Sequence, residues 1–296
     1  MFKKVVVGVD EHGSRDAIAL AKKLTADDGE IALAHVYPYR RAPAVRGYDE
    51  YDAAESVRAR DLLRAASEDA SVGAALHWTP STSVGRGLHE LVEGLGADLL
   101  VVGSTRHGLV GRILGGDDTH AALEGAPCAV AVAPAGYAAH PGRIQRIGVG
   151  YDGSPESRWA LAMARALASE LDATLAALEV VCFPAHPFGD PFATDRASIE
   201  HLVDAARERI RHLGAIEPHA AYGRATEELV IWSAGVDLLV VGSRGFGPVG
   251  RLMHGSTSQG LARGTRCPLL VLARAAPAPG APDAPDSISA GATAGA

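Results

Sequence analysis

The sequence predicts an α/β protein built from two tandem, doubly wound parallel sheets. Short β-branched apolar runs alternate with segments of helical periodicity, which is the pattern of parallel strands covered by helices on both faces. The same succession of segments occurs twice in 296 residues, and a chain of this length has room for two ordinary domains.

The duplication is visible in the motifs. Residues 97–104 (ADLLVVGS) return as residues 236–243 (VDLLVVGS), at an offset of about 140 residues. Two shorter matches, Val7–Asp10 with Val149–Asp152 and Gly85-Arg86 with Gly223-Arg224, have a similar offset. A period this long indicates a duplicated domain and not a solenoid. We therefore expect domains at residues 1–136 and 144–274, joined by a Pro- and Gly-rich linker.

The expected elements follow the same order in both units. Strands are expected where unbroken apolar runs occur, at residues 5–9, 31–36, 72–78, 99–103 and 129–132 of the first unit. The second unit repeats them at the run before Asp152 and at residues 174–181, 216–222, 238–242 and 269–272. Helices are expected where apolar residues recur three or four positions apart, around residues 17–24, 59–66, 160–167 and 199–206, with a third helix before each fourth strand.

Composition narrows the function. The net charge is −7, from 28 Lys and Arg against 35 Asp and Glu, which argues against a nucleic-acid binder or a protein bound to an anionic membrane surface. No apolar run approaches the ~18 residues of a membrane span, so we expect a cytoplasmic protein with reduced thiols. Cys128 and Cys267 precede the last strands and are expected to be small buried residues. Residues 275–296 are expected to be disordered.

The strongest candidate site is the Gly-rich segment after the fourth strand of the second unit, residues 242–258. Gly242 and Gly245 permit close approach of the backbone to a ligand, and Gly255-Ser256-Thr257-Ser258 is predicted to open a helix, whose N-terminus suits phosphate. The alternative is that these hydroxyls only cap the helix. The segment is not a Walker loop, because no Lys occurs after Lys23. Nor is this segment a GxGxxG loop directly after a first strand, so it is not the dinucleotide-binding fingerprint. The nucleophile elbow GxSxG is missing from the sequence.

The spacing Gly242-x2-Gly245-x9-Gly255-Ser256 resembles the nucleotide-binding signature of ATP-binding universal stress proteins. The strand-end Asp152 and the run VDLLVV, which comes directly before Gly242, also resemble this family. The resemblance covers about residues 3–274. It implies two Rossmann-like sheets of five strands, with ATP at the point where strand order reverses. It also implies that last strands pair, either between the two halves or in a homodimer.

The same resemblance implies the ligand contacts in the second domain. Gly150, Asp152 and Val180 would border the base. The ribose and phosphates would be surrounded by residues of the Gly-rich segment, namely Gly242, Ser243, Arg244, Gly245, Phe246, Gly247, Gly255, Ser256, Thr257 and Ser258. Mg²⁺ would help neutralise the triphosphate.

The first domain departs from this pattern. Arg106 stands where Gly245 stands, and Asp117, followed by Asp118, stands where Ser256 stands. A carboxylate at a helix N-terminus competes with phosphate and repels it. We therefore expect weak or absent binding there, and its matching positions are weaker candidates: Gly8, Asp10, Gly103 and Gly116. A metal site formed by His107, Asp117, Asp118 and His120 matches no known spacing, and a solvated capping pair is the favoured interpretation.

Three functions remain open. The first is a nucleotide-dependent regulatory module in the stress response, with ATP as its partner. The second is a slow ATP hydrolase or phosphotransferase, which the missing Lys and the lack of a general base disfavour. The third is an interaction scaffold that binds no nucleotide, which the intact glycines of the second domain disfavour.

Overall fold

The computed structural model describes residues 1–10, 14–38, 48–104, 117–182, 196–243 and 256–272. The first half contains β1 (Phe2–Gly8), α1 (Ser14–Leu24), β2 (Thr25–Pro38), α2 (Tyr48–Asp69), β3 (Ala75–Ser81), α3 (Val84–Leu95), β4 (Leu99–Gly103), α4 (Asp117–Leu123) and β5 (Ala129–Ala133). The second half contains β6 (Arg146–Gly150), α5 (Pro155–Leu171), β7 (Thr174–Val181), α6 (Arg196–Arg211), β8 (Glu217–Tyr222), α7 (Ala225–Trp232), β9 (Leu238–Gly242), α8 (Ser256–Gly264) and β10 (Leu269–Leu272).

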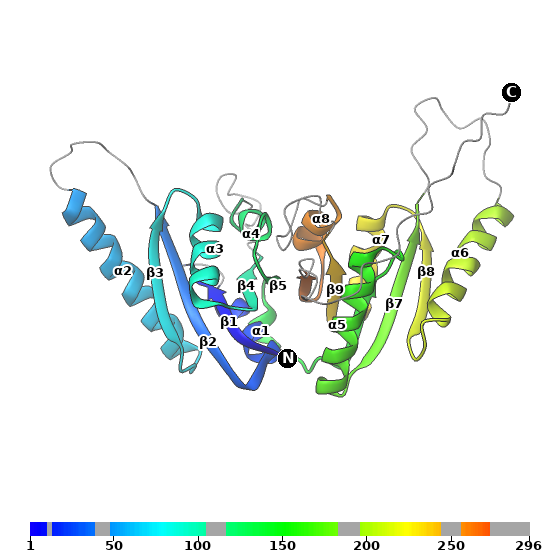
Figure 1. Ribbon diagram of the computed structural model, residues 1–296, viewed down its shortest axis with the longest axis horizontal. Coiled ribbons are helices and arrows are strands. Elements are labelled where there is room, and N and C mark those ends of the chain that lie inside the picture. The colour runs from blue at the N-terminus through cyan, green and yellow to red at the C-terminus, as the bar shows by residue number, and fades with distance from the viewer. Residues whose placement is uncertain (11–13, 39–47, 105–116, 183–195, 244–255, 273–296) are drawn as a thin grey trace, which may run out of the picture.

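The predicted fold class is confirmed, and the two halves also share one sheet. Each half contributes five parallel strands, and the complete strand order is β3-β2-β1-β4-β5-β10-β9-β6-β7-β8. The halves lie side by side in Figure 1, with α2 and α6 at the outer flanks. In both halves the order reverses between the first and fourth strands, which is where ligands of such sheets bind.

The two halves meet through β5 and β10, which pair antiparallel. Leu270 faces Ala131, and the flanking pairs are Leu269 with Val132 and Val271 with Val130. The pairing is therefore symmetric about the Ala131–Leu270 pair, because each flanking pair joins positions that are equivalent to those of the other flanking pair. The same relation would hold across a two-fold axis. This pairing covers an edge that each apolar last strand would otherwise expose.

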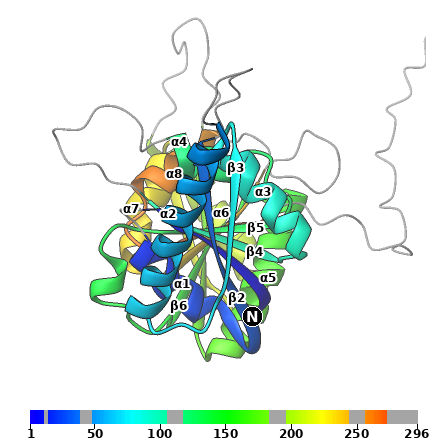
Figure 2. The ribbon, with the colours of Figure 1, turned by 90° about the vertical axis from the view of Figure 1, so that its left-hand side faces the viewer.

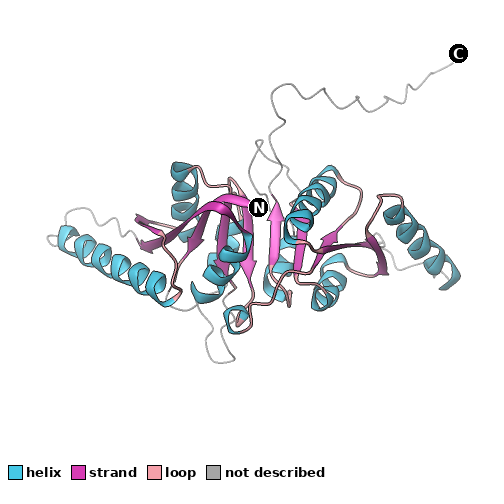
Figure 3. Cartoon of the chain, turned by 90° about the horizontal axis from the view of Figure 1, so that it is seen from below, coloured by secondary structure: helices cyan, strands magenta, loops and turns pink. Residues whose placement is uncertain are grey.

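Helices cover both faces of the sheet (Figure 3). One buried cluster contains side chains of α1, α2, α5 and α6, and a second contains side chains of α3, α4, α7 and α8. Each cluster includes residues from both halves, so the two domains share their apolar cores. Figure 2 views the outer flank of the first half, where α2 lies across β3.

The third strand of the first half starts later than predicted, at Ala75 instead of Val72. Ser71 has φ 47°, and Val72 is tied to the end of α2 because its N–H donates to the Ser67 carbonyl while the Ser67 hydroxyl donates to the Val72 carbonyl. These bonds hold Val72 in the turn that follows the helix, so it is not part of the strand.

The third helices also differ from the sequence match between Gly85 and Gly223. Gly85 is the second residue of α3, whereas Gly223 lies before α7. In space, Leu88 of α3 lies against Gly8 as Leu229 of α7 lies against Gly150. The two helices therefore correspond with a shift of about one turn relative to the motif alignment, because packing on the first strand determines the correspondence.

The linker between the halves is held by the first domain. The Asp16 carboxylate of α1 accepts hydrogen bonds from the N–H groups of Gly136 (2.8 Å) and Ala138 (2.7 Å). Gly136 precedes a short 3₁₀ helix, η1 (Tyr137–Ala139), and Ala138 lies within it; Tyr137 packs against the shared core. Among the described residues, no helix is both long and apolar enough to cross a membrane.

Candidate functional site

A cavity of about 170 Å³ opens at the carboxyl ends of the strands in the second half, at the reversal of strand order. Gly150 and Asp152 line it from the end of β6, Val180 from β7 and Gly242 from β9. Thr257 and Ser258, in the first turn of α8, also line it. The fold thus brings together six of the predicted positions, which come from four separate segments.

Asp152 is held in place by the beginning of α5. Its Oδ1 accepts hydrogen bonds from the Ser154 N–H (3.0 Å) and the Ser154 hydroxyl (2.5 Å). Ser154 also caps α5, because its Oγ accepts from the Ser157 N–H (3.2 Å), and the Ser157 hydroxyl donates to the Ser154 carbonyl (3.0 Å). The capping network therefore fixes the carboxylate at the cavity mouth.

Gly242 is required by close packing. A Cβ built on it would lie 2.4 Å from the carbonyl oxygen of Glu156, in the first turn of α5. Any side chain at this position would push the end of β9 away from α5, and with it the start of the Gly-rich segment.

Other predicted positions do not line the cavity or are not described. Ser243 is 2% exposed, and its N–H donates to the Leu272 carbonyl (3.1 Å); it lies beside the cavity and does not line it. Ser256 is the first residue of α8. The remaining predicted positions of the segment lie outside the described residues: Arg244, Gly245, Phe246, Gly247 and Gly255.

The cavity includes residues that sequence reasoning missed. Ala225 and Leu229 of α7, together with Leu178 of β7, form much of its apolar wall, and Cys182 lies at its mouth. The motif Asp152-Gly153-Ser154 carried a usable signal, since a Ser two residues after a strand-end Asp is a typical helix cap. The α7 contribution had no local signal, because it depends on how that helix packs on β6.

The side chains at the same place in the first half are more deeply buried. Strand register makes Val36 the counterpart of Val180, and Val36 and Tyr37 are both buried. A Cβ built on Gly87 of α3 would lie 2.6 Å from Val36 Cγ1, so the helix rests directly on the strand end. Ser81, at the end of β3, is buried against the same glycine.

The weaker candidates of the first half also reach this edge. Gly8 ends β1, Gly103 ends β4, and Asp10 follows β1. Thr119, the counterpart of Ser258, donates its hydroxyl to the Gly103 carbonyl at 3.1 Å. Gly116 and His107 lie outside the described residues. His120 contacts Gln259 of α8 and Glu124, and no metal-binding cluster occurs within the described part of the chain.

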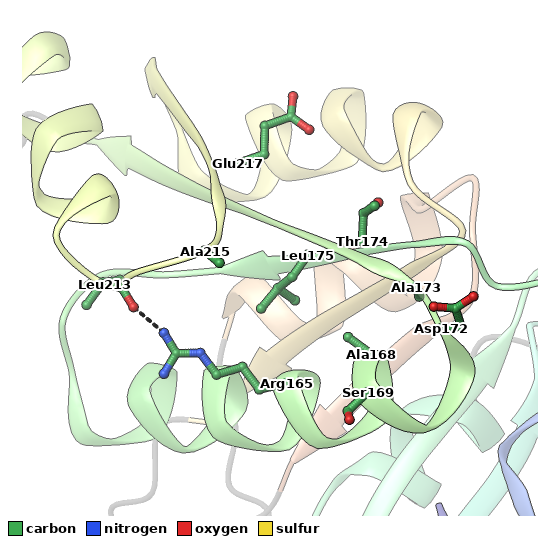
Figure 4. A pocket seen from close by; sticks show the side chains of 10 residues that line it. All are labelled: Arg165, Ala168, Ser169, Asp172, Ala173, Thr174, Leu175, Leu213, Ala215 and Glu217. Carbon is green, nitrogen blue, oxygen red and sulfur yellow. Dashed lines mark hydrogen bonds between the residues drawn. The ribbon is translucent and has the colours of Figure 1, made fainter.

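A second hollow, of about 910 Å³, lies at the opposite edge of the second half (Figure 4). It is broad and open, and two of its charged side chains, Arg165 and Glu217, have partners. Arg165 donates to the Leu213 carbonyl, and Glu217 accepts from Arg146 at 2.7 Å. This hollow lies at the amino ends of β7 and β8, far from the reversal of strand order.

Each half of the chain matches the same protein-family model. The model of the universal stress protein family matches residues 1–134 and again residues 143–273. The chain belongs to the universal stress protein family. It carries two domains of that family in tandem, in agreement with the resemblance seen in the sequence.

Related universal stress proteins cover both domains. One from Mycobacterium tuberculosis is 26% identical over 244 residues, which is 76% of this chain and 80% of the relative. A crystal structure of a universal stress protein from Archaeoglobus fulgidus aligns with 92% of this chain and 98% of its own, with a TM-score of 0.64 and 17% identity, a likeness of fold. A universal stress protein solved in complex with cAMP aligns with 45% of this chain at 27% identity, with a TM-score of 0.32.

Cys128 and Cys267, which hold equivalent positions in the two domains of this universal stress protein, are buried free thiols. Burial raises the pKa of both the Cys128 and the Cys267 thiol to about 12, as their expected role as small core residues requires. Cys182 is exposed and lies at the cavity of the second domain.

Proposed function

We propose that this universal stress protein binds one ATP per chain, in the second domain, and acts as a nucleotide-dependent regulatory module in the cytoplasm. The observation that carries the proposal is the cavity itself. It lies at the reversal of strand order and combines an apolar wall of Val180 and Leu229 with a fixed carboxylate, Asp152. The first turn of α8 faces the same space through Thr257 and Ser258.

The size and chemistry of the cavity suit part of a nucleotide. About 170 Å³ is less than the ~300–1,000 Å³ of a pocket that holds a whole drug-sized ligand. We assign this volume to the base and its sugar. The phosphates then extend toward the helix N-terminus and the Gly-rich segment, where main-chain N–H groups and hydroxyls supply donors for an anion.

Magnesium fits this arrangement as a companion of the phosphates. Mg²⁺ prefers oxygen ligands and keeps several waters, and the hydroxyls of Thr257 and Ser258 would be the closest protein oxygens in the first turn of α8. When bound, the ion would neutralise charge on the triphosphate. The protein's part is to hold the base against Val180 and to orient the phosphates toward α8.

The test is to denature the purified native protein and to identify and quantify any nucleotide that it releases, and then to titrate nucleotide-free protein with MgATP. About one ATP per chain is expected, and Gly245→Arg, which installs the residue of the first domain, should abolish it. About two per chain would contradict the single site. ADP instead of ATP would favour slow hydrolysis, and no nucleotide together with no binding of added MgATP would overturn the proposal.

A further inference from the structure

The contact between α7 and α8 depends on two glycines of α8. A Cβ built on Gly260 would lie 2.4 Å from Thr226 Cγ2, and one built on Gly264 would lie 2.9 Å from Val230 Cγ2. Gly260 and Gly264 are four residues apart in α8, and Thr226 and Val230 are four residues apart in α7. Each helix therefore presents its two residues on one face. At these two points α8 approaches α7 more closely than any residue with a side chain would allow.

The first domain builds the corresponding contact with the glycine on the other helix. Gly85 is the second residue of α3, as Thr226 is of α7, and Ala121 is the fifth residue of α4, as Gly260 is of α8. A Cβ built on Gly85 would lie 2.2 Å from the Ala121 carbonyl oxygen. Close approach of the two helices is therefore common to both domains, whereas its chemical basis differs.

Neither Gly260 nor Thr226 lines the cavity, but both lie within a turn of residues that do. Thr257 and Ser258 of α8 face the cavity, as does Ala225 of α7. We infer that Gly260 is a positioning residue for the nucleotide site. By letting α8 rest on Thr226, it sets the distance between the N-terminus of α8 and the bound phosphates. This inference rests on the proposed function.

The helix cannot easily move to absorb a change at this contact. Gln259, next to Gly260, contacts His120 of the first domain, and Leu261 and Ala262 are buried in the shared core. Because packed interiors shift as units, an added methyl group should displace the first turn of α8. The attraction between a helix N-terminus and an anion falls off within one turn, so a small displacement should be measurable in binding.

The experiment compares Gly260→Ala with the double variant Gly260→Ala/Thr226→Ser in the full-length protein. The serine removes Cγ2, the atom that the new methyl group would meet, and it keeps the hydroxyl. The matched control is Gly85→Ala, which adds a methyl group at the corresponding contact of the first domain. Two quantities are measured: the Kd for MgATP by calorimetry, and hydrogen exchange of the amides in residues 256–264.

We expect Gly260→Ala to weaken MgATP binding by about tenfold and to speed exchange in the first turn of α8. The double variant should return to within about twofold of the unchanged protein in both measurements. Gly85→Ala should lower Tm and leave the Kd for MgATP unchanged.

Two results would overturn the inference. One is unchanged Kd and unchanged exchange in Gly260→Ala. The other is a double variant that recovers Tm but not affinity, since Gly260 would then act through something other than Thr226. If the unchanged protein binds no MgATP, the proposed function fails. In that case the hydrogen-exchange rates alone decide whether Gly260 positions α8. Equal rates in the unchanged protein, in Gly260→Ala and in the double variant would refute that role.

Discussion

The two domains of this chain differ most at the carboxyl edges of their sheets, although their scaffolds match strand for strand. In the second domain, Val180 borders a cavity and α8 begins with Ser256. In the first domain, Val36 is buried beneath Gly87 of α3 and α4 begins with Asp117. The comparison separates two features that the proposed nucleotide site would need: a space for the base and a helix N-terminus free of competing carboxylates.

The largest effect is expected when the charge of the first domain is transferred to the second. Ser256→Asp should weaken MgATP binding by at least about a hundredfold. Two unit charges 4 Å apart interact by about 4 kcal/mol at an effective dielectric constant near 20, and about 2.7 kcal/mol already corresponds to a hundredfold change in affinity. Calorimetric titration of the folded variant measures the effect.

Ser256→Asn is the matched control, because it has nearly the same size as the aspartate variant and also caps helices. It should cost no more than about tenfold in affinity. Equal losses in the two variants would mean that size, and not charge, excludes nucleotide.

A smaller effect is expected when MgATP is added and the reactivity of the cysteine thiols is measured. At pH 8, Cys182 should react with a thiol reagent in the native protein, and Cys128 and Cys267 should react only after unfolding. With a pKa of about 12, only about one in 10⁴ of the buried thiols is ionised at that pH. MgATP at ten times its Kd should slow the labelling of Cys182 about tenfold.

The control is Cys182→Ser, which should remove the fast-reacting thiol. Labelling of Cys182 that MgATP does not change would contradict a ligand in this cavity.

The pKa values of Cys128 and Cys267 also predict how the free energy of unfolding changes with pH. In the unfolded chain the two buried thiols ionise near their ordinary value of 9.0. The free energy of unfolding should therefore fall as pH rises from about 9 toward 12, and stay unaffected by these groups below that range.

The smallest effect is expected from repair of the first domain. The double variant Arg106→Gly/Asp117→Ser restores the predicted signature in its Gly-rich segment. We still expect one MgATP per chain by calorimetric stoichiometry, because Val36, the counterpart of Val180, is buried against Gly87 of α3 and is not available to border a base. Two per chain would show that the segment alone decides binding.

Local pattern was sufficient for the order of the elements and for six predicted positions that the structure brings together around the cavity of the second half. Asp152, Gly242 and the start of α8 could be predicted because each is attached to a strand end or a helix start that the sequence marks. The burial of Val36 in the first domain could not be predicted, since it depends on α3 lying about one turn away from its motif alignment with α7. Such shifts are set by packing on a neighbouring strand, as between Leu88 and Gly8.

Long-range contacts were equally invisible. Nothing near Asp16 indicates that its carboxylate holds the linker through Gly136 and Ala138. The wall formed by Leu229 likewise comes from an apolar residue whose sequence context is that of any core position. These features are determined by which segments meet in space.

The symmetric pairing of β5 with β10 has an evolutionary consequence. In an association of two identical chains, every mutation appears on both sides of the axis, so an altered nucleotide loop would damage both sites at once. Here the strands on the two sides belong to one polypeptide, and Ala131 already faces Leu270. A substitution in one half therefore leaves the other half unchanged, and differences between the two halves are inherited together.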